Sequence, residues 1–547
     1  MILSGKRKSF LGSVLIVLLG IVYLAAQPPG KPGDMTVVST SSASLLIQIS
    51  LMIRAGSAHD PAGKEGLAYL TGHTLLQGGF GNPADPVTKE QLALMTRPWG
   101  QGAKPSVRVA KEATTFYITV PGDVLEEYLN RVLRPLLSQP LFQARELDRI
   151  RAETVENLSG ALRYEDTEGL GLNAIDHFIF EGTSYAHLSS GSVQGLANVS
   201  REDLLAFYTT HYRPEYAILA LNKGDATSRA RVSKAVEKIG QGFDQTAKLS
   251  RAALKGPLSF RGRHAVIVSV PNADSSGLHA AFPISVTRHS RDYWPLYVAN
   301  VFFGVHRDGF SHLFREIRQK RGYNYGDYSY IEHFASRPRS LFPPFNTPRS
   351  RQYFSIWIRP VAHRYALHLL KGLTWELENF VREGLTEAQV AAAKNKAKVL
   401  YLNLAETGSR LLNVRLDDAF YSQSASGYLD HYLERLDAVT VEQVNSAIRT
   451  HLKTENLKYV VVTHSDQAEN LANQLAGDLP AAGKSLEEYQ IPNIDHQGKE
   501  VHAISPDKLE ILQKDAVWGS YRLGVPRDHI RIVPADRIFE TGEFVAP

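Results

Sequence analysis

Apolar positions along the chain follow two patterns, one typical of strands and one typical of helices. Residues 44–56 have the β-branched and apolar content of a strand, and residues 105–121 have that of two strands. Residues 65–79 form an apolar stretch that runs into two glycines, which is typical of a helix and its end. Strands followed by runs of helices favour an α+β fold over a doubly wound parallel sheet.

Long helices are predicted in both halves of the chain. In the first half, Pro140 separates two amphipathic stretches, residues 121–140 and 142–167. In the second half, helices are predicted over residues 292–304, 309–322, 363–384 and 386–416. The last of these ranges reads as one continuous helix.

One unit of this pattern occurs twice. Capping-box-like helix starts lie at Ser200 and Thr440, and an apolar strand follows each of the two helices. His211 and His451 lie at the same offset from these starts. The spacing is too long for a solenoid repeat and indicates a duplicated domain, although helix-then-strand units also recur by chance in α/β chains.

The N-terminus combines a basic flank with a long apolar run. Basic residues at positions 6–8 precede residues 10–26, which carry no charge and approach the lower limit of a membrane span. We expect an uncleaved signal-anchor, because Tyr23 and Leu24 stand where a cleavage site needs small residues; a cleaved signal is the alternative. The body would then lie in the periplasm, anchored to a bacterial-type inner membrane, or be exported if the signal is cleaved.

These patterns divide the chain into five segments. They are a signal-anchor and spacer (1–34), an N-terminal domain (35–245), a linker (246–262), a C-terminal domain (263–477) and a C-terminal extension (478–547). The extension has short apolar runs and many turn residues. We expect it to pack on the body or on a partner.

Composition excludes several classes of function. The 547 residues include 61 basic and 56 acidic side chains, and part of the small positive excess lies in the N-terminal flank, so the charge gives little support for nucleic-acid binding. The chain has no cysteine. This excludes disulfides, thiolate zinc sites, iron–sulfur clusters and cysteine catalysis, and it fits an oxidising compartment without requiring one.

Residues 54–79 resemble the start of the pitrilysin/insulinase family of zinc metallopeptidases, which includes mitochondrial processing peptidase and the core subunits of the respiratory bc1 complex. In that family the helix carries the motif H-x-x-E-H: two histidines on one helical face share a metal, and the glutamate polarises a zinc-bound water. In this chain the motif positions are Tyr69-Leu70-Thr71-Gly72-His73. Tyr69 therefore replaces the first ligand, Gly72 replaces the general base, and His73 remains.

The resemblance places the third zinc ligand on a later helix, where Glu153 falls on the ligand position. His73 and Glu153 are thus residual metal positions from an incomplete set, which should bind zinc weakly, and Gly72 cannot move a proton. We expect no cofactor in this chain and zinc in a partner subunit. Weak zinc binding here is the remaining possibility.

Residues 310–330 resemble the segment of the family's second domain that carries an arginine and a tyrosine seven residues apart, here Arg318 and Tyr325. In active members this pair reaches across to the zinc-bearing domain and steadies the substrate. A guanidinium and a phenol can both donate to a developing oxyanion. On the sequence alone, a solvated helix charge and a packed aromatic are the alternative interpretation.

The resemblance covers roughly residues 40–475. It implies two homologous α+β domains, each a mostly antiparallel sheet with helices packed on one face, preceded by the N-terminal membrane helix and enclosing a peptide chamber. Some bacterial members resemble heterodimers in which one chain keeps the zinc motif and its partner keeps the Arg/Tyr pair. We therefore expect a non-catalytic subunit that is inactive alone, binds a peptide or unfolded protein, and pairs with a zinc-bearing partner.

Two other functions stay open. One is a membrane-anchored structural subunit of a larger complex, comparable with the bc1 core subunits. The other is a self-sufficient zinc endopeptidase with a rewired site. Nucleic acid is not expected as a partner, because the sequence lacks a basic patch or an aromatic-interleaved basic motif.

Overall fold

The structure is a computed structural model. It describes residues 35–241, 260–334, 346–405, 407–421, 427–489, 493–494, 500–501 and 506–543. The N-terminal membrane helix predicted within residues 1–34, and most of the linker predicted at 246–262, lie outside the described residues. Within the described part, no helix has the length and apolar character needed to cross a membrane.

The two halves contain the same five-stranded arrangement. The N-half sheet has the order β1-β7-β2-β6-β5, formed by β1 (Thr36–Ser39), β2 (Leu46–Ile53), β5 (Ser106–Val109), β6 (Thr114–Pro121) and β7 (Ala217–Leu221). The C-half sheet has the order β10-β11-β9-β12-β8, formed by β8 (His264–Val270), β9 (Ser276–Ile284), β10 (Asp327–Tyr330), β11 (Gln352–Val361) and β12 (Lys458–His464). In each sheet one of these pairs, β1–β7 or β8–β12, is parallel and the others are antiparallel. The predicted α+β fold with two homologous halves is confirmed.

Helices follow the strands in each half. Those of the N-half are α1 (Leu67–Gln77), α2 (Lys89–Thr96), α3 (Leu125–Tyr128), α4 (Arg134–Ser138), α5 (Ala144–Glu156), α6 (Thr167–Ile179), α7 (Val193–Ala197), α8 (Arg201–His211) and α9 (Ala226–Val236). Those of the C-half are α10 (Tyr293–Gly304), α11 (Ala366–Glu383), α12 (Glu387–Ala405), α13 (Gly408–Tyr421), α14 (Tyr432–Asp437), α15 (Val441–His451) and α16 (Ser465–Ala476). The capping boxes predicted at Ser200 and Thr440 are present at the starts of α8 and α15, so the repeated unit is confirmed at this level.

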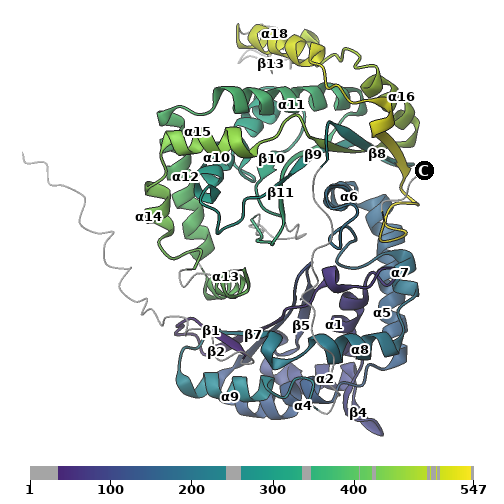
Figure 1. Ribbon diagram of the computed structural model, residues 1–547, viewed down its shortest axis with the longest axis vertical. Coiled ribbons are helices and arrows are strands. Elements are labelled where there is room, and N and C mark those ends of the chain that lie inside the picture. The colour runs from purple at the N-terminus through teal and green to yellow at the C-terminus, as the bar shows by residue number, and fades with distance from the viewer. Residues whose placement is uncertain are drawn as a thin grey trace, which may run out of the picture.

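The helix predicted over residues 386–416 is divided in two, which corrects that prediction. α12 ends at Ala405, and the hydroxyl of Thr407 accepts a hydrogen bond from the backbone N–H of Arg410 at 3.3 Å. Thr407 therefore caps a new helix, α13, that begins at Gly408. The break allows α13 to leave the C-half and approach the other half of the molecule (Figure 1).

Each half places one helix on the sheet of the other half. α6, which belongs to the N-half, packs against β9, β11 and β12, and α13, which belongs to the C-half, packs against β1, β2 and β7 (Figure 1). The second face of the N-half sheet presents Met52, Ile218 and Ala220, and these side chains pack with Leu412 and Leu416 of α13. The expectation of helices on one face is therefore incomplete, because both faces are apolar and both are covered.

The hydrophobic core continues from one half into the other. Leu170 and Phe178 of α6 belong to the same buried cluster as Val266 and Val460 of the C-half sheet and as the core of the N-half. Burying one such side chain contributes roughly 1.5–3 kcal/mol. The two halves therefore cannot separate without exposing a large apolar surface.

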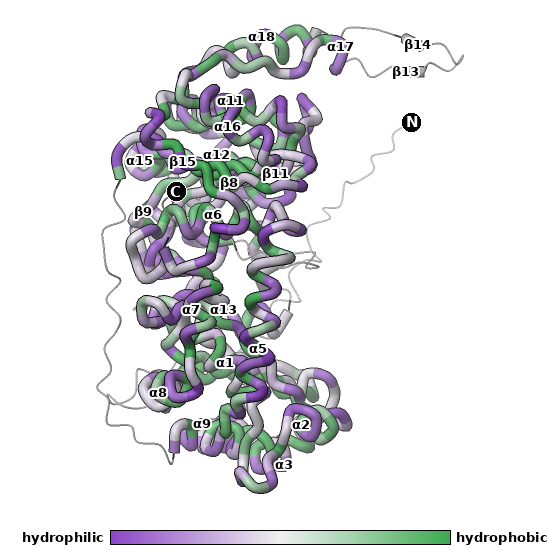
Figure 2. The backbone as a smooth tube through the Cα atoms, turned by 90° about the vertical axis from the view of Figure 1, so that its right-hand side faces the viewer, coloured by the Kyte–Doolittle hydropathy of each residue, from purple (hydrophilic) through white to green (hydrophobic). Residues whose placement is uncertain are grey.

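The C-terminal extension packs on the C-half and then crosses to the N-half. Its strand β15 (Ile530–Pro534) pairs in parallel with β8 and gives this sheet a sixth strand. Its helix α18 (Pro506–Ser520) lies on α11 at one end of the molecule (Figure 2). Smaller elements are α17 (Leu486–Tyr489) and the strand pairs β3 (Phe80–Asn82) with β4 (Asp85–Val87) and β13 (Asn493–Ile494) with β14 (Glu500–Val501).

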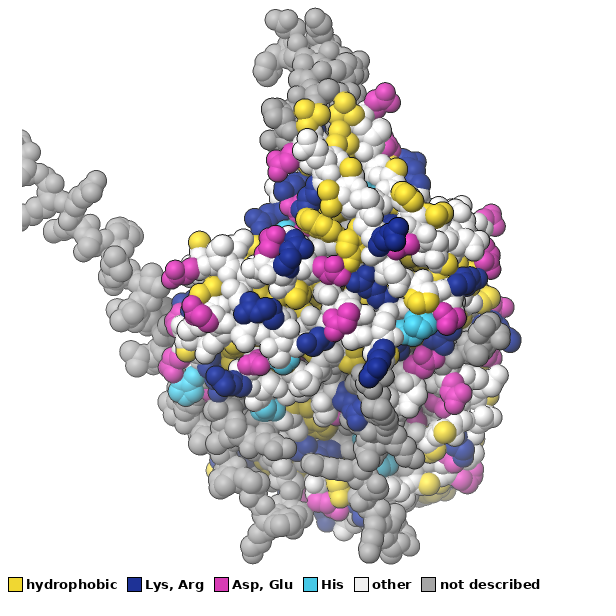
Figure 3. All heavy atoms as spheres, turned by 45° about the horizontal axis from the view of Figure 1, so that its top comes forward, with side chains coloured by type: hydrophobic (Ala, Val, Ile, Leu, Met, Phe, Trp, Pro, Cys, Tyr) yellow, Lys and Arg dark blue, Asp and Glu magenta, His cyan; other side chains and the backbone are white. Residues whose placement is uncertain are grey.

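Charged side chains of both signs are interspersed on the face that Figure 3 shows. On that face no continuous basic stripe forms. Such a stripe is typical of surfaces that bind nucleic acid.

The crossing of the extension depends on Arg163, which is buried. Its guanidinium donates to the carbonyl oxygen of Ile538 at 2.6 and 3.0 Å and pairs with Glu540 at 3.0 Å. We predict that Arg163→Ala lowers the free energy of unfolding by about 3 kcal/mol, because it leaves a buried carbonyl and a carboxylate without their donor. The exposed pair Arg131–Glu127 provides the control, since Arg131→Ala should cost about 0.5 kcal/mol or less. Equal shifts of the two urea midpoints would show that the Arg163 contact adds nothing to the tie between the extension and the N-half.

Candidate functional site

The helix that corresponds to the family's zinc motif is α1, and it lies against β5 and α5. Tyr69 and His73 are one turn apart on the same face, with ring centroids 4.1 Å apart and ring planes inclined by 31°. Both rings are half-buried. The sequence-predicted positions are therefore brought together on one helix, but the first of them presents a phenol in contact with the remaining imidazole.

Gly72 is enclosed by side chains of the N-half sheet. A Cβ atom at this position would lie 3.2 Å from a methyl carbon of Thr114, 3.3 Å from one of Val107 and 3.4 Å from one of Val109. These separations are tight for carbon atoms in a packed interior. The position of the lost general base is thus closed by the packing of α1 on β5, and a longer side chain there would have to displace the valines.

Glu153, the residual third ligand position, is held in an ion pair. Its carboxylate lies 2.5 Å from the Arg149 guanidinium, and the Glu153 side chain is 62% exposed. Arg149 also donates to Glu146 at 2.8 Å and to Gln77, at the end of α1, at 2.5 Å. The carboxylate that the resemblance assigned to zinc is therefore paired with an arginine that also joins α5 to α1.

The protonation state of His73 would permit a metal, but that of Tyr69 does not favour one. Burial lowers the pKa of His73 to about 4, so its imidazole is neutral at pH 7. Burial also raises the pKa of Tyr69, the charge of Glu153 raises it further, and a hydrogen bond with Thr154 lowers it. Tyr69 is therefore a protonated phenol at neutral pH and not an anionic ligand.

These residues do not fit a zinc site. Zinc in proteins takes three or four nitrogen, sulfur or carboxylate donors. α1 and α5 offer one neutral imidazole, one protonated phenol and one carboxylate that is already paired. Across the described ranges, no group of three or more His, Asp or Glu side chains is placed to hold a metal ion. We derive no metal chemistry from this helix.

The Arg/Tyr pair of the C-half lies together on the surface. Arg318 belongs to a π-helical turn, Phe314–Gln319, and its Nη1 donates to the carbonyl oxygen of Tyr325 at 2.6 Å. Its guanidinium also lies 5.7 Å from the ring centroid of Tyr325. Tyr325 is 75% exposed. The phenol is thus presented to solvent beside a fixed positive charge, which suits contact with another molecule.

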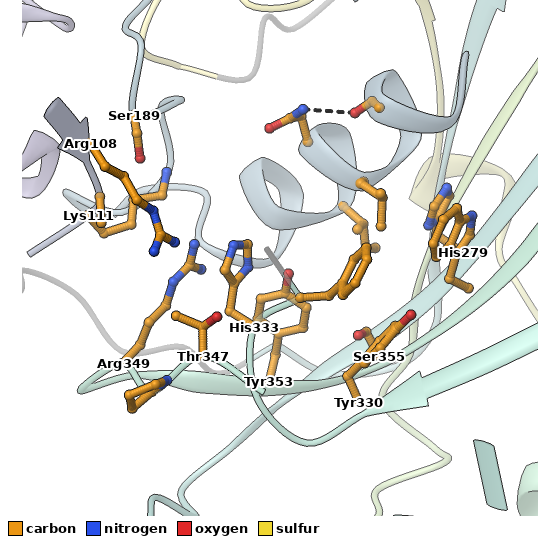
Figure 4. Close-up of a pocket in the computed structure, with 18 of the residues that line it drawn as sticks. Arg108, Lys111, Ser189, His279, Tyr330, His333, Thr347, Arg349, Tyr353 and Ser355 are labelled. Atoms are coloured by element: carbon orange, nitrogen blue, oxygen red, sulfur yellow. Dashed lines mark hydrogen bonds between the residues drawn. The ribbon is translucent and has the colours of Figure 1, made fainter. Parts of the chain in front are cut away.

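A cavity of about 260 Å³ lies between the two halves (Figure 4). The N-half contributes residues 108–111 and side chains of α6 to its lining, and the C-half contributes β9, β10, β11 and residues 347–349. Its polar lining includes Arg108, Lys111 and Arg349. The cavity is therefore built from both halves of the duplicated fold.

A buried ion group adjoins this cavity. Asp176, near the end of α6, lies 2.6 Å from Arg349 and 3.5 Å from Lys111, and all three side chains are buried. Burial by itself would raise the pKa of Asp176, but the charges of Arg349 and Lys111 outweigh it and hold that pKa below its usual range. Burial lowers the pKa of Lys111 to about 8.

This ion group was not predicted from the sequence. The available signal was a charged residue, Asp176, in a mostly apolar stretch, residues 170–180, because an unpaired carboxylate is rarely buried. Its partners Lys111 and Arg349 lie far away in the chain, and nothing local in the sequence indicates which cations it meets.

Two family models match the chain. Residues 36–166 match the model described as insulinase (peptidase family M16), and residues 198–397 match the model described as the peptidase M16 inactive domain. Together they cover more than half of the chain. The chain belongs to the insulinase (M16) family. The resemblance that the sequence motifs indicated is confirmed.

Individual M16 relatives agree over most of the chain. An uncharacterized zinc protease of Mycobacterium tuberculosis is 23% identical over 455 residues, which cover 83% of this chain and 96% of the relative. Subunit 1 of the mitochondrial cytochrome b-c1 complex of Caenorhabditis elegans is 22% identical over 452 residues, which cover 81% of this chain and 88% of that subunit.

Solved structures show the same M16 fold. A peptidase M16 inactive domain from Pseudomonas fluorescens has a TM-score of 0.65 at 20% identity and covers 79% of this chain and 96% of that one. A chain of complex III from Candida albicans has a TM-score of 0.56 at 16% identity and covers 78% of this chain and 93% of that one. At these identities the likeness establishes the fold and leaves activity to be argued from the site.

The low pKa of His73 predicts a pH dependence of stability. Between about pH 6.5 and pH 4 the unfolded chain takes up a proton at this residue that the folded chain does not, so His73 lowers the stability as the pH falls through this window. His73→Gln removes this contribution. The difference in unfolding free energy between variant and wild type should shift by about 1–3 kcal/mol in favour of the variant between pH 7 and pH 4. Urea midpoints measure it, with His289→Gln at an exposed position as control. A pH-independent difference contradicts the prediction.

The closed space at Gly72 makes a second prediction. Gly72→Glu should lower the free energy of unfolding by about 1–3 kcal/mol, because the added side chain overpacks the contact of α1 with β5. Gly160→Glu is the matched control, since a Cβ at that helical glycine would have no atom within 4 Å in the described structure apart from its own helix backbone and chain neighbours. Adding Val107→Ala to Gly72→Glu should recover part of the loss, which a double-mutant cycle measures. Equal effects at the two glycines would show that the base position is open.

Proposed function

We propose that this M16 chain is a non-catalytic subunit of a heteromeric peptidase. It supplies one wall of the peptide chamber and the Arg318–Tyr325 pair, and a partner supplies zinc and the general base. The observation that carries the proposal is the contrast between the two motifs. On α1 the first ligand position holds a tyrosine that does not fit zinc and the base position is a glycine enclosed by packing, whereas Arg318 and Tyr325 remain paired and Tyr325 is exposed.

Arg318 is suited to act on a carbonyl group. A guanidinium has five N–H donors, and the contact with the Tyr325 carbonyl fixes its orientation while using one of them. The remaining donors and the exposed phenol can stabilise negative charge on a peptide oxygen held by the partner's metal site. The role proposed for the pair is therefore electrostatic, and it requires no proton transfer on this chain.

An extended peptide is the substrate class that the chamber favours. Among the described strands, β5 ends the N-half sheet and β10 ends the C-half sheet on the corresponding side. Val109 of β5 and Tyr330 of β10 line the same cavity. A peptide or an unfolded segment can bind such an edge by adding a strand to it.

We further propose that the N-terminal apolar run at residues 10–26 anchors the protein in an inner membrane with the body in the periplasm, or directs its export. The basic flank at residues 6–8 supports this orientation, because basic residues are retained on the cytoplasmic side.

A structural subunit of a larger complex is the second candidate. It is favoured by the interlocked halves and by the tie that Arg163 makes to the C-terminal extension, features that suit a stable scaffold. The likeness to a subunit of the cytochrome b-c1 complex points in the same direction. A self-sufficient zinc endopeptidase has less support, because the donor set on α1 does not fit the metal.

Reconstitution with a partner tests the proposal. The isolated chain should cleave no fluorogenic peptide, and adding a family member with an intact H-x-x-E-H motif from the same genome should give chelator-sensitive cleavage. Arg318→Ala should lower the turnover of the complex about 10²-fold without preventing assembly, because it removes a charged donor to the oxyanion. Arg315→Ala, on the same helical turn, is the matched control. Chelator-sensitive cleavage by the isolated chain contradicts the proposal, and a stable complex without any protease favours the structural subunit.

A further inference from the structure

The cavity between the halves gathers more positive than negative charge. Arg108, Lys111 and Arg349 line it, and Asp176 is the carboxylate that pairs with two of them. Figure 4 shows the guanidinium groups of Arg108 and Arg349 pointing toward one another, with the ring of His333 beside them. Like charges that converge in this way repel unless an anion lies between them.

Arg108 is the cation that Asp176 does not neutralise. Asp176 uses its two oxygens for Arg349 and Lys111. Within the described part of the chain, Arg108 has no hydrogen-bond or ion-pair partner, although its side chain is half-buried. A half-buried guanidinium without a partner is costly, and its planar fork matches a carboxylate.

The two histidines of the cavity lining are neutral and add no charge to it. Burial lowers the pKa of His333 well below its ordinary value; the charges of Arg349, Arg108 and Lys111 lower it further, and the charge of Asp176 raises it. Burial lowers the pKa of His279 to about 3. Both imidazoles are therefore neutral at pH 7.

Two other carboxylates lie near the cavity but not in its lining. Glu112 accepts a hydrogen bond from the backbone N–H of Ser350 at 3.0 Å and does not line the cavity. Asp417, on α13, also lies outside the lining; burial raises its pKa to about 6, the charges of Arg288 and Arg108 oppose that rise, and the group is mostly ionised at pH 7. The excess of positive charge is therefore a property of the lining itself, which holds three cations and no carboxylate among the described residues.

Part of the cavity lining is aromatic. Tyr330, Phe334, Tyr353 and Trp357 line the cavity from β10, β11 and the segment that follows β10. The volume of about 260 Å³ is slightly below the range of about 300–1,000 Å³ found for small-molecule sites. A cationic end and an apolar wall in a space of this size suit one amphipathic residue that bears a carboxylate.

We propose that this cavity binds a carboxylate of a peptide, with the Arg108 guanidinium as its principal partner and the adjoining apolar group against Phe334 and Trp357. The choice of a peptide as the ligand rests on the proposed function. The carboxylate can be the C-terminal group of the peptide or the side chain of an acidic residue. Either carboxylate would neutralise the charge of Arg108, which Asp176 does not pair with.

Calorimetric titration of the full chain, without any partner subunit, tests the inference. The probes are the N-acetylated tripeptide Ala-Ala-Phe with a free carboxylate, the same tripeptide as its carboxamide, and the carboxamide with glutamate in place of phenylalanine. The free acid should bind at least tenfold more tightly than its carboxamide if the cavity takes a C-terminus. If the cavity takes an acidic side chain, the glutamate carboxamide should bind at least tenfold more tightly than the phenylalanine carboxamide. The inference is overturned if neither carboxylate peptide binds more tightly than the neutral one.

Arg108→Gln should weaken binding of the preferred carboxylate peptide about tenfold or more, and it should leave the neutral peptide unaffected. Arg131→Gln, at an exposed position outside the cavity lining, is the matched control and should change neither. Thermal unfolding of each variant verifies that the fold is retained. Equal binding of the carboxylate peptide by Arg108→Gln and Arg131→Gln contradicts the inference, since the preference for an acid would then reflect net charge alone. The titration uses no partner and measures no cleavage, so its failure is separable from a failure of reconstitution.

Discussion

The structure depends on one constraint: each sheet has two apolar faces, and the helices of its own half cover only one of them. The second face is buried by a helix from the other half, α6 on the C-half sheet and α13 on the N-half sheet. Because the hydrophobic contribution scales with the area removed from water, this exchange joins the halves more strongly than a linker could. The C-terminal extension adds a second connection, through β15 at the sheet edge and Arg163 in the N-half. The chamber between the halves is thus part of the folded core.

The two family motifs have different surroundings. α1 packs closely on β5, and Gly72 marks the point where the helix meets Val107 and Val109. A helix this close to the sheet has no room for a proton-transferring side chain. The segment around Arg318 and Tyr325 lies at the surface of the C-half, where a change of partner does not disturb the core. Loss of the zinc site and retention of the Arg/Tyr pair are therefore compatible within one stable fold.

The parts of this structure that the sequence predicts are those fixed by local chemistry. The helix starts at Ser200 and Thr440 each depend on a hydroxyl and on a side chain three residues later. Both helix starts can therefore be recognised in the sequence, and both are present in the structure. The division of the helix predicted over residues 386–416 was missed, because the tertiary contacts of α13 decide it as much as the cap at Thr407 does. The cavity was missed for a different reason. Arg108, Asp176 and Arg349 are each ordinary in their local sequence, and only the exchange of α6 brings them together.

The ion group of Asp176, Arg349 and Lys111 at the cavity raises the question of whether it serves stability or binding. Removing charges from water costs several kcal/mol per ion, and well-packed apolar residues in place of a buried pair are often neutral or stabilising. Stability alone therefore does not account for the group of Asp176, Arg349 and Lys111 between α6 and the C-half sheet. Nor does it account for Arg108 at the same cavity, which has no hydrogen-bond or ion-pair partner among the described residues. A charge arrangement that is costly for folding and incomplete without an anion is better explained by binding. If, as proposed, this chain serves a peptidase without holding the metal, its contribution is recognition, and the cations that line the cavity favour a ligand with a carboxylate.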